Sequence, residues 1–292
     1  MTRVRLGAVG YLNARPLVYE LERRPRFDVR YDTPSECARL LHSGATDLGL
    51  VPSIEYLRGG PYRIVPDVAI ASNGPVASVA LYTAKAIDAI GSIALDTSSR
   101  TSVALTQLLC ARHFKIAPSF VHLGPDLTEM LARCDAALII GDAALLLDHT
   151  KVRLKAEPPT VRRVRLQPDL QKIDLGEVWT KMTGLPFVYA FWAGRPEALT
   201  SDDVAALQVA RDAGVAQPRR IAQAYFADPA HFVRLAASFV APSAEHEAIG
   251  ARYLRDNIKY HLGDAERAGL EAFYRYAAEA GVVAEARPLA FY

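Results

Sequence analysis

Four apolar runs in this chain are each followed by small or polar residues and then by a segment with helical spacing. They lie at 4–10, 47–52, 92–96 and 136–141. A buried strand, a loop and a covering helix give this order, and its repetition is typical of an α/β fold with a largely parallel sheet. In such sheets a ligand binds beyond the carboxyl ends of the strands, where the loops gather. We therefore expect function in the loops after these runs.

The chain changes character from Ser201 onward, where helix signals follow one another. Ser201 and Ser243 each precede acidic residues, which suits the positive end of a helix, and Gly281 can end the last helix. Apolar and aromatic residues recur there at helical spacing, which favours a packing stripe over a cofactor site. The positions expected in this core are Tyr253, Ile258, Leu270, Phe273 and Tyr276.

Two β-prone segments, 78–85 and 186–194, bracket a middle section with its own strand and helix units. A chain that crosses once into a second lobe and once back forms a hinge at the crossings and a ligand cleft between the lobes. The expected division is lobe one from 1–83 plus 192–292, and lobe two from 84–191.

Composition and charge narrow the classes of function. The 292 residues are 51% hydrophobic and 23% charged, which is enough for one large core or two ordinary ones. The formal net charge of +2 gives no general attraction to nucleic acid, and the basic stretch 151–165 lacks interleaved aromatics. No export signal is apparent and no apolar run approaches the ~20 residues of a membrane helix. We expect a cytoplasmic protein that neither binds nucleic acid nor inserts into membranes.

The stretch from Asp96 to Ser102 crowds hydroxyl groups at the start of an expected helix. A helix N-terminus offers unpaired N–H groups and partial positive charge, so added hydroxyl donors make a cradle for a carboxylate or phosphate. Capping by Ser98 or Ser99 is the competing interpretation, and Arg100 alternatively points to solvent. The candidate ligand contacts are Thr97, Ser98, Ser99, Arg100, Thr101 and Ser102.

Two further loops supply candidates. Asn13 follows the first strand and suits a helix N-cap, yet it also puts a neutral donor and acceptor at the strand's carboxyl end, beside Tyr11. Ser72 and Asn73 are typical turn residues, but they precede the proposed hinge and, with Ser78, are placed to face a ligand.

Asp142 is the one acid at a strand end within a very apolar run. A helix N-cap is its leading interpretation, and a ligand contact is the second. The seven histidines are scattered without metal-ligand spacing, and GxGxxG, P-loop, HExxH and GxSxG motifs are missing. We expect no metal and no nucleotide cofactor. Three cysteines without paired or metal-like spacing predict reduced, buried thiols: Cys37, Cys110 and Cys134.

Taken in order, five segments resemble the chorismate dehydratase family of menaquinone biosynthesis, which has the type II periplasmic-binding-protein fold. They are YLNARPL (11–17), VPSIEYL (51–57), DTSSRTS (96–102), IGD (140–142) and the stretch 174–188. Together they span most of 4–195, whereas the tail resembles the fold alone and 151–172 has no counterpart. The resemblance implies a two-lobed α/β protein with a cleft between the lobes and a helical C-terminal tail.

The resemblance implies a hydro-lyase that removes water from chorismate to give 3-[(1-carboxyvinyl)oxy]benzoate in the futalosine pathway, without a cofactor. Loss of the C3 proton gives an extended enolate that expels the C4 hydroxyl, so the site must hold two carboxylates and hydrogen-bond the leaving hydroxide. Asn13 is the expected catalytic residue. No acid stands out as the base among Glu55, Asp96, Asp142 and Glu177, and the substrate's own enolpyruvyl carboxylate is an alternative.

Three other functions share the fold. A solute-binding protein for a small carboxylate would carry an export signal or lipid-anchor cysteine, and a regulator would need a DNA-binding segment, for which residues 1–3 leave no room. The related dihydroxynaphthoate synthase is expected to show different cleft motifs. The sequence therefore favours the dehydratase and leaves the oligomeric state open.

Overall fold

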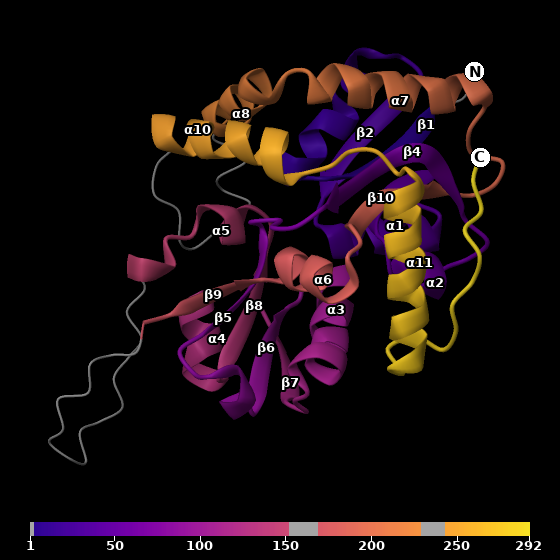
Figure 1. Ribbon diagram of the computed structural model, residues 1–292. Coiled ribbons are helices and arrows are strands. Elements are labelled where there is room, and N and C mark those ends of the chain that lie inside the picture. The colour runs from indigo at the N-terminus through magenta and orange to yellow at the C-terminus, as the bar shows by residue number, and fades with distance from the viewer. Residues whose placement is uncertain (1–2, 152–168, 229–242) are drawn as a thin grey trace, which may run out of the picture.

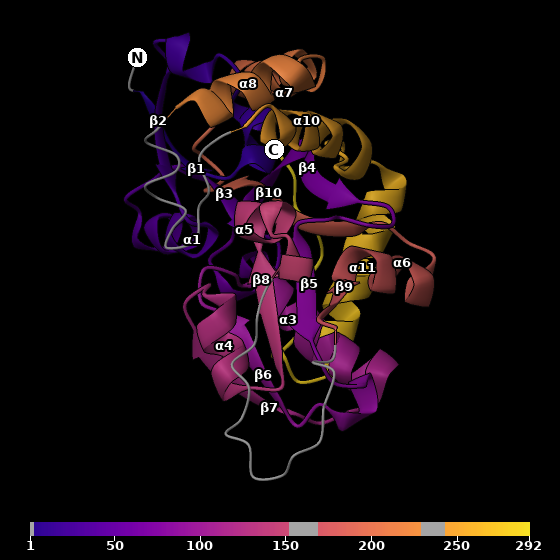
Figure 2. The same ribbon diagram turned by 90° about the vertical axis from the view of Figure 1, so that its left-hand side faces the viewer.

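The computed structural model describes residues 3–151, 169–228 and 243–292. These residues form a mixed α/β protein with two five-stranded sheets, one above the other in Figures 1 and 2. The basic stretch 151–165 lies, apart from its first residue, outside the described residues. Within the described part of the chain, no helix is long and apolar enough to cross a membrane.

The first sheet has the strand order β2-β1-β3-β10-β4. Its strands are β1 (Val4–Val9), β2 (Phe27–Asp32), β3 (Leu48–Pro52), β4 (Arg63–Ser72) and β10 (Phe187–Gly194). β1 pairs in parallel with β2 and β3, whereas β10 is antiparallel to both β3 and β4 and lies between them. Every residue of β3 and β10 is buried, as expected for strands covered on both faces.

The second sheet has the order β7-β6-β8-β5-β9. Its strands are β5 (Val79–Thr83), β6 (Ser92–Asp96), β7 (Ser119–Leu123), β8 (Ala136–Ile140) and β9 (Gln171–Asp174). β6 is parallel to β7 and β8, and β5 is antiparallel to β8 and β9. All four runs that opened the sequence analysis are therefore strands, namely β1, β3, β6 and β8.

The helices of the first lobe cover its sheet, with α7, α8 and α10 above it in Figure 1. They are the 3₁₀ helices η1 (Leu12–Val18) and η2 (Leu21–Arg23), α1 (Pro34–Ser43), α2 (Glu55–Arg58), α7 (Ser201–Val215), α8 (Pro218–Ala227), α10 (Ala244–Arg252), the π-helix η6 (Tyr253–Asn257) and α11 (Asp264–Glu279). The cap of α7 is Thr200, one residue before Ser201, because Thr200 and Asp203 form a capping box. Ser243 caps α10 as predicted.

The second lobe carries its own helices, and α11 packs along both lobes by touching β10 and α3. The second-lobe elements are η3 (Ile87–Ala89), α3 (Thr101–Leu109), the π-helix η4 (Cys110–Phe114), α4 (Leu127–Arg133), α5 (Gly141–Leu146), η5 (His149–Lys151) and α6 (Leu175–Thr183). The predicted tail core is buried except for Tyr276, which is half-buried, and the three cysteines are free and buried.

Strand pairing corrects the expected lobe boundaries. β5, placed at the end of lobe one, pairs in the second sheet, and β10, mostly placed in lobe two, pairs in the first. A strand that is buried on both faces has the same apolar sequence pattern in either sheet. The sequence alone therefore assigned β5 and most of β10 to the wrong lobe. The chain crosses between Ser72 and Val79, and returns between Thr183 and Phe187.

The first crossing is fastened to the elements that lead into the second. The backbone N–H groups of Val76 and Ala77 donate to the carboxylate of Asp174, over 3.1 and 2.6 Å. Gly74 N–H donates to the Thr180 hydroxyl over 2.9 Å. The two crossings are therefore neighbours, as a hinge requires.

Candidate functional site

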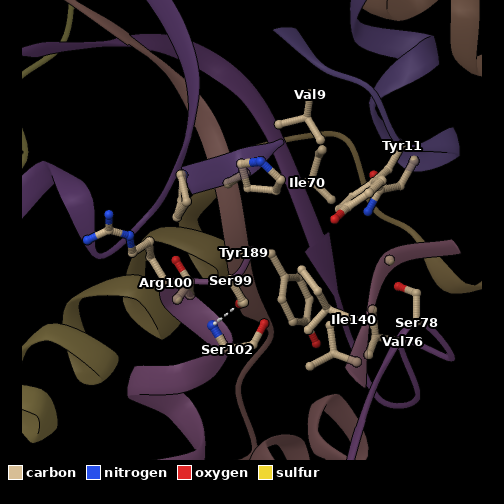
Figure 3. A pocket seen from close by; sticks show the side chains of 17 residues that line it. Val9, Tyr11, Ile70, Val76, Ser78, Ser99, Arg100, Ser102, Ile140 and Tyr189 are labelled. Carbon is tan, nitrogen blue, oxygen red and sulfur yellow. Dashed lines mark hydrogen bonds between the residues drawn. The ribbon is translucent and has the colours of Figure 1, made fainter. Parts of the chain in front are cut away.

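A pocket lies between the lobes, where the carboxyl ends of β1, β3 and β8 meet. Figure 3 shows its lining side chains, which come from both lobes and from the first crossing. Among the lining residues that the structure describes, Arg100 is the one cation, and there is no aspartate or glutamate. The wall therefore suits an anionic ligand. The lining residues are Val9, Tyr11, Asn13, Pro34, Pro52, Ile70, Val76, Ser78, Val79, Ser99, Arg100, Thr101, Ser102, Ile140, Gly141, Tyr189 and Ala190.

The start of α3 contributes four consecutive residues to this wall, from Ser99 to Ser102. The Ser99 hydroxyl accepts from the backbone N–H of Ser102 over 3.2 Å, which is the bond drawn in Figure 3. Capping by Ser99 and a place in the cavity wall thus occur together at one residue. The helix still presents its positive end and the Ser102 side chain to the cavity.

Thr97 and Ser98 do not line the cavity. Thr97 is exposed, and the Ser98 hydroxyl donates to the buried carboxylate of Asp96 over 2.7 Å. Burial raises the pKa of Asp96, and the bonds from Ser98 oppose this rise. The structure therefore brings only Ser99 to Ser102 of the hydroxyl run to the cavity, because the Ser98 side chain turns back onto β6 and Thr97 is exposed.

Thr101 joins the two lobes as well as lining the cavity. Its hydroxyl oxygen accepts from the backbone N–H of Ile54 over 3.2 Å and lies 3.4 Å from the Ser53 hydroxyl. Tyr11 makes a second link, because its phenol donates to the Ser98 hydroxyl over 3.2 Å. Burial raises the pKa of Tyr11 well above its ordinary value, so it is a neutral donor. These contacts hold the lobes together around the cavity.

Asn13 lines the cavity but caps no helix. Tyr11 occupies the N-cap position of η1, and its own side chain makes no cap bond. The Asn13 side-chain oxygen Oδ1 is buried without a hydrogen-bond partner in the described protein, and the backbone carbonyl of Asn13 accepts from Tyr260 over 3.1 Å. The capping interpretation of Asn13 is wrong, because η1 already begins at Leu12 and Asn13 is its second residue. The Asn13 side chain is part of the cavity wall.

Asp142 supplies the missing cap from the other lobe. Its buried carboxylate accepts from Leu12 N–H at 3.2 and 3.3 Å and from the Tyr225 phenol at 2.6 Å. Burial raises the pKa of Asp142 to about 6, although these bonds oppose the rise. The N-cap interpretation of Asp142 is corrected, since its side chain does not cap its own helix, and Asp142 lies behind the residues that line the cavity.

The three candidate residues of the first crossing occupy different places. Ser78 lines the cavity, whereas Asn73 is exposed and lies outside it. Ser72 is buried, and its hydroxyl lies 3.1 Å from the phenol of Tyr189, a lining residue that the sequence analysis missed. The one signal for Tyr189 was a polar group inside an otherwise apolar strand. Ser72 supports the wall rather than forming it.

A buried carboxylate stands behind the cation of the cavity. Glu55 Oε1 lies 4.0 Å from Arg100 Nη1, and Glu55 also bonds His42 at 3.0 Å and Arg58 at 3.1 Å. Burial acts to raise the pKa of Glu55, but His42, Arg58 and Arg100 outweigh it and lower that pKa. Glu55 is therefore an ionised partner for Arg100 and lies outside the cavity wall.

No group of three or more potential metal ligands occurs among the residues described by the structure. The hydroxyls, the amide and the guanidinium of the wall suit carboxylate oxygens rather than a cation. Its chemistry is that of binding, orientation and hydrogen bonding to an anion.

Comparison with known proteins gives the relatives of this chain. A family model described as menaquinone biosynthesis matches residues 4–279. The chain is 34% identical over 274 residues to the chorismate dehydratase of Thermus thermophilus, covering 92% of this chain and 93% of that protein.

Solved structures show the fold. Protein AF1704 from Archaeoglobus fulgidus matches with a TM-score of 0.70 at 15% identity, covering 96% of this chain and 98% of that one. The periplasmic aliphatic sulphonate binding protein SsuA from Escherichia coli matches with a TM-score of 0.60 at 16% identity, covering 99% and 94%. The predicted periplasmic-binding-protein-like architecture is confirmed.

Proposed function

This chain belongs to the menaquinone-biosynthesis family, and from that premise we propose that it is a chorismate dehydratase. The observation that carries the proposal is its 34% identity, across 92% of its length, to a protein of that name. The cavity adds chemical support, because hydroxyls, one guanidinium and a helix N-terminus line it without any carboxylate among the described residues. Chorismate is a small dicarboxylate that needs such partners.

The cradle at the start of α3 is proposed to hold one carboxylate of the substrate. Arg100 supplies the charge, and Ser99, Thr101 and Ser102 supply hydroxyl groups beside the positive end of the helix. Tyr11 and Asn13 line the cavity from the start of η1, and Ser78 lines it from the first crossing. They are proposed to hold the ring and its hydroxyl, so that the reacting atoms are oriented between the lobes.

The elimination begins with removal of the C3 proton. Since no aspartate or glutamate of the described residues lines the cavity, the enolpyruvyl carboxylate of the substrate is the proposed acceptor of this proton. The C–H electrons enter the ring as an extended enolate on the ring carboxylate. Their return breaks the C4–O bond, and the departing hydroxide takes the proton to form water.

Asn13 is the proposed catalytic residue because its amide can hydrogen-bond the C4 oxygen without adding negative charge beside a dianion. Hydrogen bonds from Tyr11 to Ser98 and from Ile54 to Thr101 join the lobes beside the cavity, and closure around the substrate would exclude water that weakens these bonds. The reaction is that of a carbon–oxygen lyase, requires no cofactor, and is proposed to take place in the cytoplasm.

Incubation of the purified protein with chorismate tests the proposal. We expect the ultraviolet spectrum of the aromatic ether to appear and chorismate to disappear in equal amounts, with no metal or nucleotide added. Likeness to sulphonate-binding proteins supports one rival, a receptor that binds without chemistry. Calorimetric binding of chorismate that is recovered unchanged would establish that rival and refute the dehydratase.

A further inference from the structure

The phenol of Tyr11 begins a short chain of hydrogen bonds that leads away from the cavity wall. Tyr11 lines the cavity (Figure 3), and its phenol donates to the hydroxyl of Ser98 over 3.2 Å. The Ser98 hydroxyl in turn donates to Oδ1 of Asp96 over 2.7 Å, and Asp96 is buried, with 1% exposure. The chain therefore runs from a side chain of the first lobe to a carboxylate at the end of β6 in the second.

The direction of these bonds is set at the carboxylate. Oδ1 of Asp96 accepts a second bond, from the backbone N–H of Ser98 over 2.9 Å, and an N–H group cannot reverse its role. A proton taken up at low pH goes to the other oxygen, Oδ2, because Oδ1 already accepts two bonds. A serine hydroxyl has one proton. Because Ser98 gives this proton to Asp96, its oxygen can only accept from Tyr11.

Contact with the second lobe also fixes the ring of Tyr11. Gly141 has a left-handed backbone conformation, with a φ of 65°, and a Cβ atom added to it would lie 2.8 Å from Cε2 of Tyr11. Glycine at this position permits both the backbone conformation and the close approach of the ring. Among the residues that the structure describes, the Tyr11 phenol makes no hydrogen bond besides the one to Ser98. Its lone pairs are therefore available to a ligand in the cavity, whereas its proton is not.

The cavity thus offers donors on one side and, at Tyr11, an acceptor on the other. The start of α3 presents hydroxyls, a guanidinium and the positive end of a helix, which suit carboxylates. An oxygen whose proton is engaged elsewhere repels a carboxylate and suits a group that can donate. The chorismate dianion carries one such group, its C4 hydroxyl, because its other oxygens belong to two carboxylates and an ether.

We propose that Tyr11 is a specificity residue that accepts a hydrogen bond from the C4 hydroxyl of the substrate, and that Ser98 and Asp96 are positioning residues that give the phenol this polarity. The inference rests on the proposed function for the identity of the ligand group, but the polarity itself is a property of the protein without substrate. Acceptance of the hydroxyl proton by Tyr11 leaves the lone pairs of the C4 oxygen to the Asn13 amide.

The first test locates the protons directly. Neutron diffraction from crystals of the substrate-free protein in heavy water should place the Tyr11 deuteron toward Ser98 and the Ser98 deuteron toward Asp96. A Ser98 deuteron that points to Tyr11, or a Tyr11 deuteron that points into the cavity, overturns the proposal.

The second test measures the preference for a donor by calorimetry. The probes are two unreactive analogues of chorismate with a saturated ring, one with a hydroxyl at C4 and one with a carbonyl there. The parent should bind the hydroxyl analogue at least about fivefold more tightly, because the carbonyl meets an oxygen without an available proton. Ser98→Ala frees the Tyr11 proton for the carbonyl, so the preference should fall below about twofold. A preference that is absent from the parent or unchanged in Ser98→Ala overturns the proposal.

Two controls separate polarity from packing, since a purely structural role of Ser98 would weaken both analogues equally. Tyr11→Phe keeps the ring and should abolish the preference, and adding Ser98→Ala to it should change the preference no further. Thr97→Ala removes a neighbouring exposed hydroxyl outside the cavity lining and should keep the preference of the parent. A further change without the phenol, or an effect of Thr97→Ala equal to that of Ser98→Ala, overturns the proposal.

Substitution of the carboxylate tests the far end of the chain. Asp96→Ala leaves the Ser98 proton without its acceptor and should reduce the preference as Ser98→Ala does; if this variant fails to fold, Ser98→Ala decides. Asp96→Asn should keep the preference, because the backbone N–H of Ser98 holds an amide oxygen in the place of Oδ1, and its loss in the folded variant overturns the role of Asp96. If the parent fails to dehydrate chorismate while the deuterons and the preference behave as expected, the proposed function fails and the assignment of Tyr11 stands.

Discussion

Asp142→Asn should change how the stability of the protein depends on pH. The carboxylate of Asp142 is buried and spans the lobes through Leu12 N–H and the Tyr225 phenol. Burial raises its pKa from 3.8 to about 6. The folded protein therefore binds a proton at Asp142 more readily than the unfolded chain does. The stability from this proton is complete below about pH 4 and is lost as the pH rises through about 6.

The size of the effect follows from the shift. A rise of about two pKa units corresponds to roughly 3 kcal/mol, because each unit is worth about 1.4 kcal/mol. Asparagine keeps an oxygen that can accept from Leu12 and Tyr225 but does not titrate. Its own added N–H group shifts stability by an amount independent of pH. The free energy of unfolding of the variant, relative to that of the parent, should therefore rise by about 2 to 3 kcal/mol between pH 4 and pH 7.

Urea unfolding at pH 4, 5, 6 and 7 provides the assay. Fluorescence can report on both lobes, because Trp179 lies in α6 and Trp192 lies in β10, and both are fully buried. Asp202→Asn, at an exposed acid near the start of α7, is the control. If the free energy of unfolding changes with pH in the same way for the parent and for Asp142→Asn, the reasoning is refuted. Asp142 would then have the same pKa in the folded and the unfolded chain.

Three other substitutions test the site and the fold. Ser102→Ala should weaken binding of the dehydration product by about 1 kcal/mol, roughly fivefold, in calorimetry, whereas Thr97→Ala should bind as the parent does; equal losses would reduce the loop to a helix cap. Asn13→Ala should keep the melting temperature, because Asn13 caps no helix, and lower turnover at least tenfold; turnover at the parent's rate would remove Asn13 from catalysis. Asp203→Asn should lose about 1 to 2 kcal/mol at pH 7. Because the hydrogen bond from Arg26 lowers the pKa of Asp203 to about 2, this loss should shrink as the pH falls toward 2, and a constant loss in urea unfolding would contradict the assignment.

Local sequence patterns were sufficient for several of the strands and for seven of the 17 residues that line the cavity. An apolar run followed by a polar loop and a helical pattern indicates a strand, a loop and a helix from contiguous residues alone. This pattern predicted β1, β3, β6 and β8, and also the loop from Ser99 to Ser102. The sheet to which β5 or β10 belongs was not, because it depends on partners far along the chain.

The misread polar residues share one physical cause. Asn13 has the signature of an N-cap, but it lies inside η1, and the first N–H of that helix, on Leu12, is capped by a carboxylate 130 residues away. Asp142 looks like the cap of its own helix because its partner cannot be seen locally. The helical spacing of apolar residues around Tyr253 predicts that its ring is buried, but it says nothing of its hydroxyl. That hydroxyl pairs with Ser78, which is 175 residues away in the sequence. Contacts across the lobes are invisible to any local rule.

The place of β10 inside the first sheet has a consequence for the nascent chain. Synthesis delivers β1 to β4 first, but β3 and β4 do not pair with each other and wait for β10, which follows the whole second lobe. The strands of the second sheet form one uninterrupted stretch of chain that ends before β10 emerges. The inserted lobe can therefore fold on the ribosome while the earlier one still exposes two unpaired strand edges, which are the edges that invite aggregation. The first sheet, whose strands β1 to β4 are synthesised first, is therefore completed last, when β10 pairs between β3 and β4.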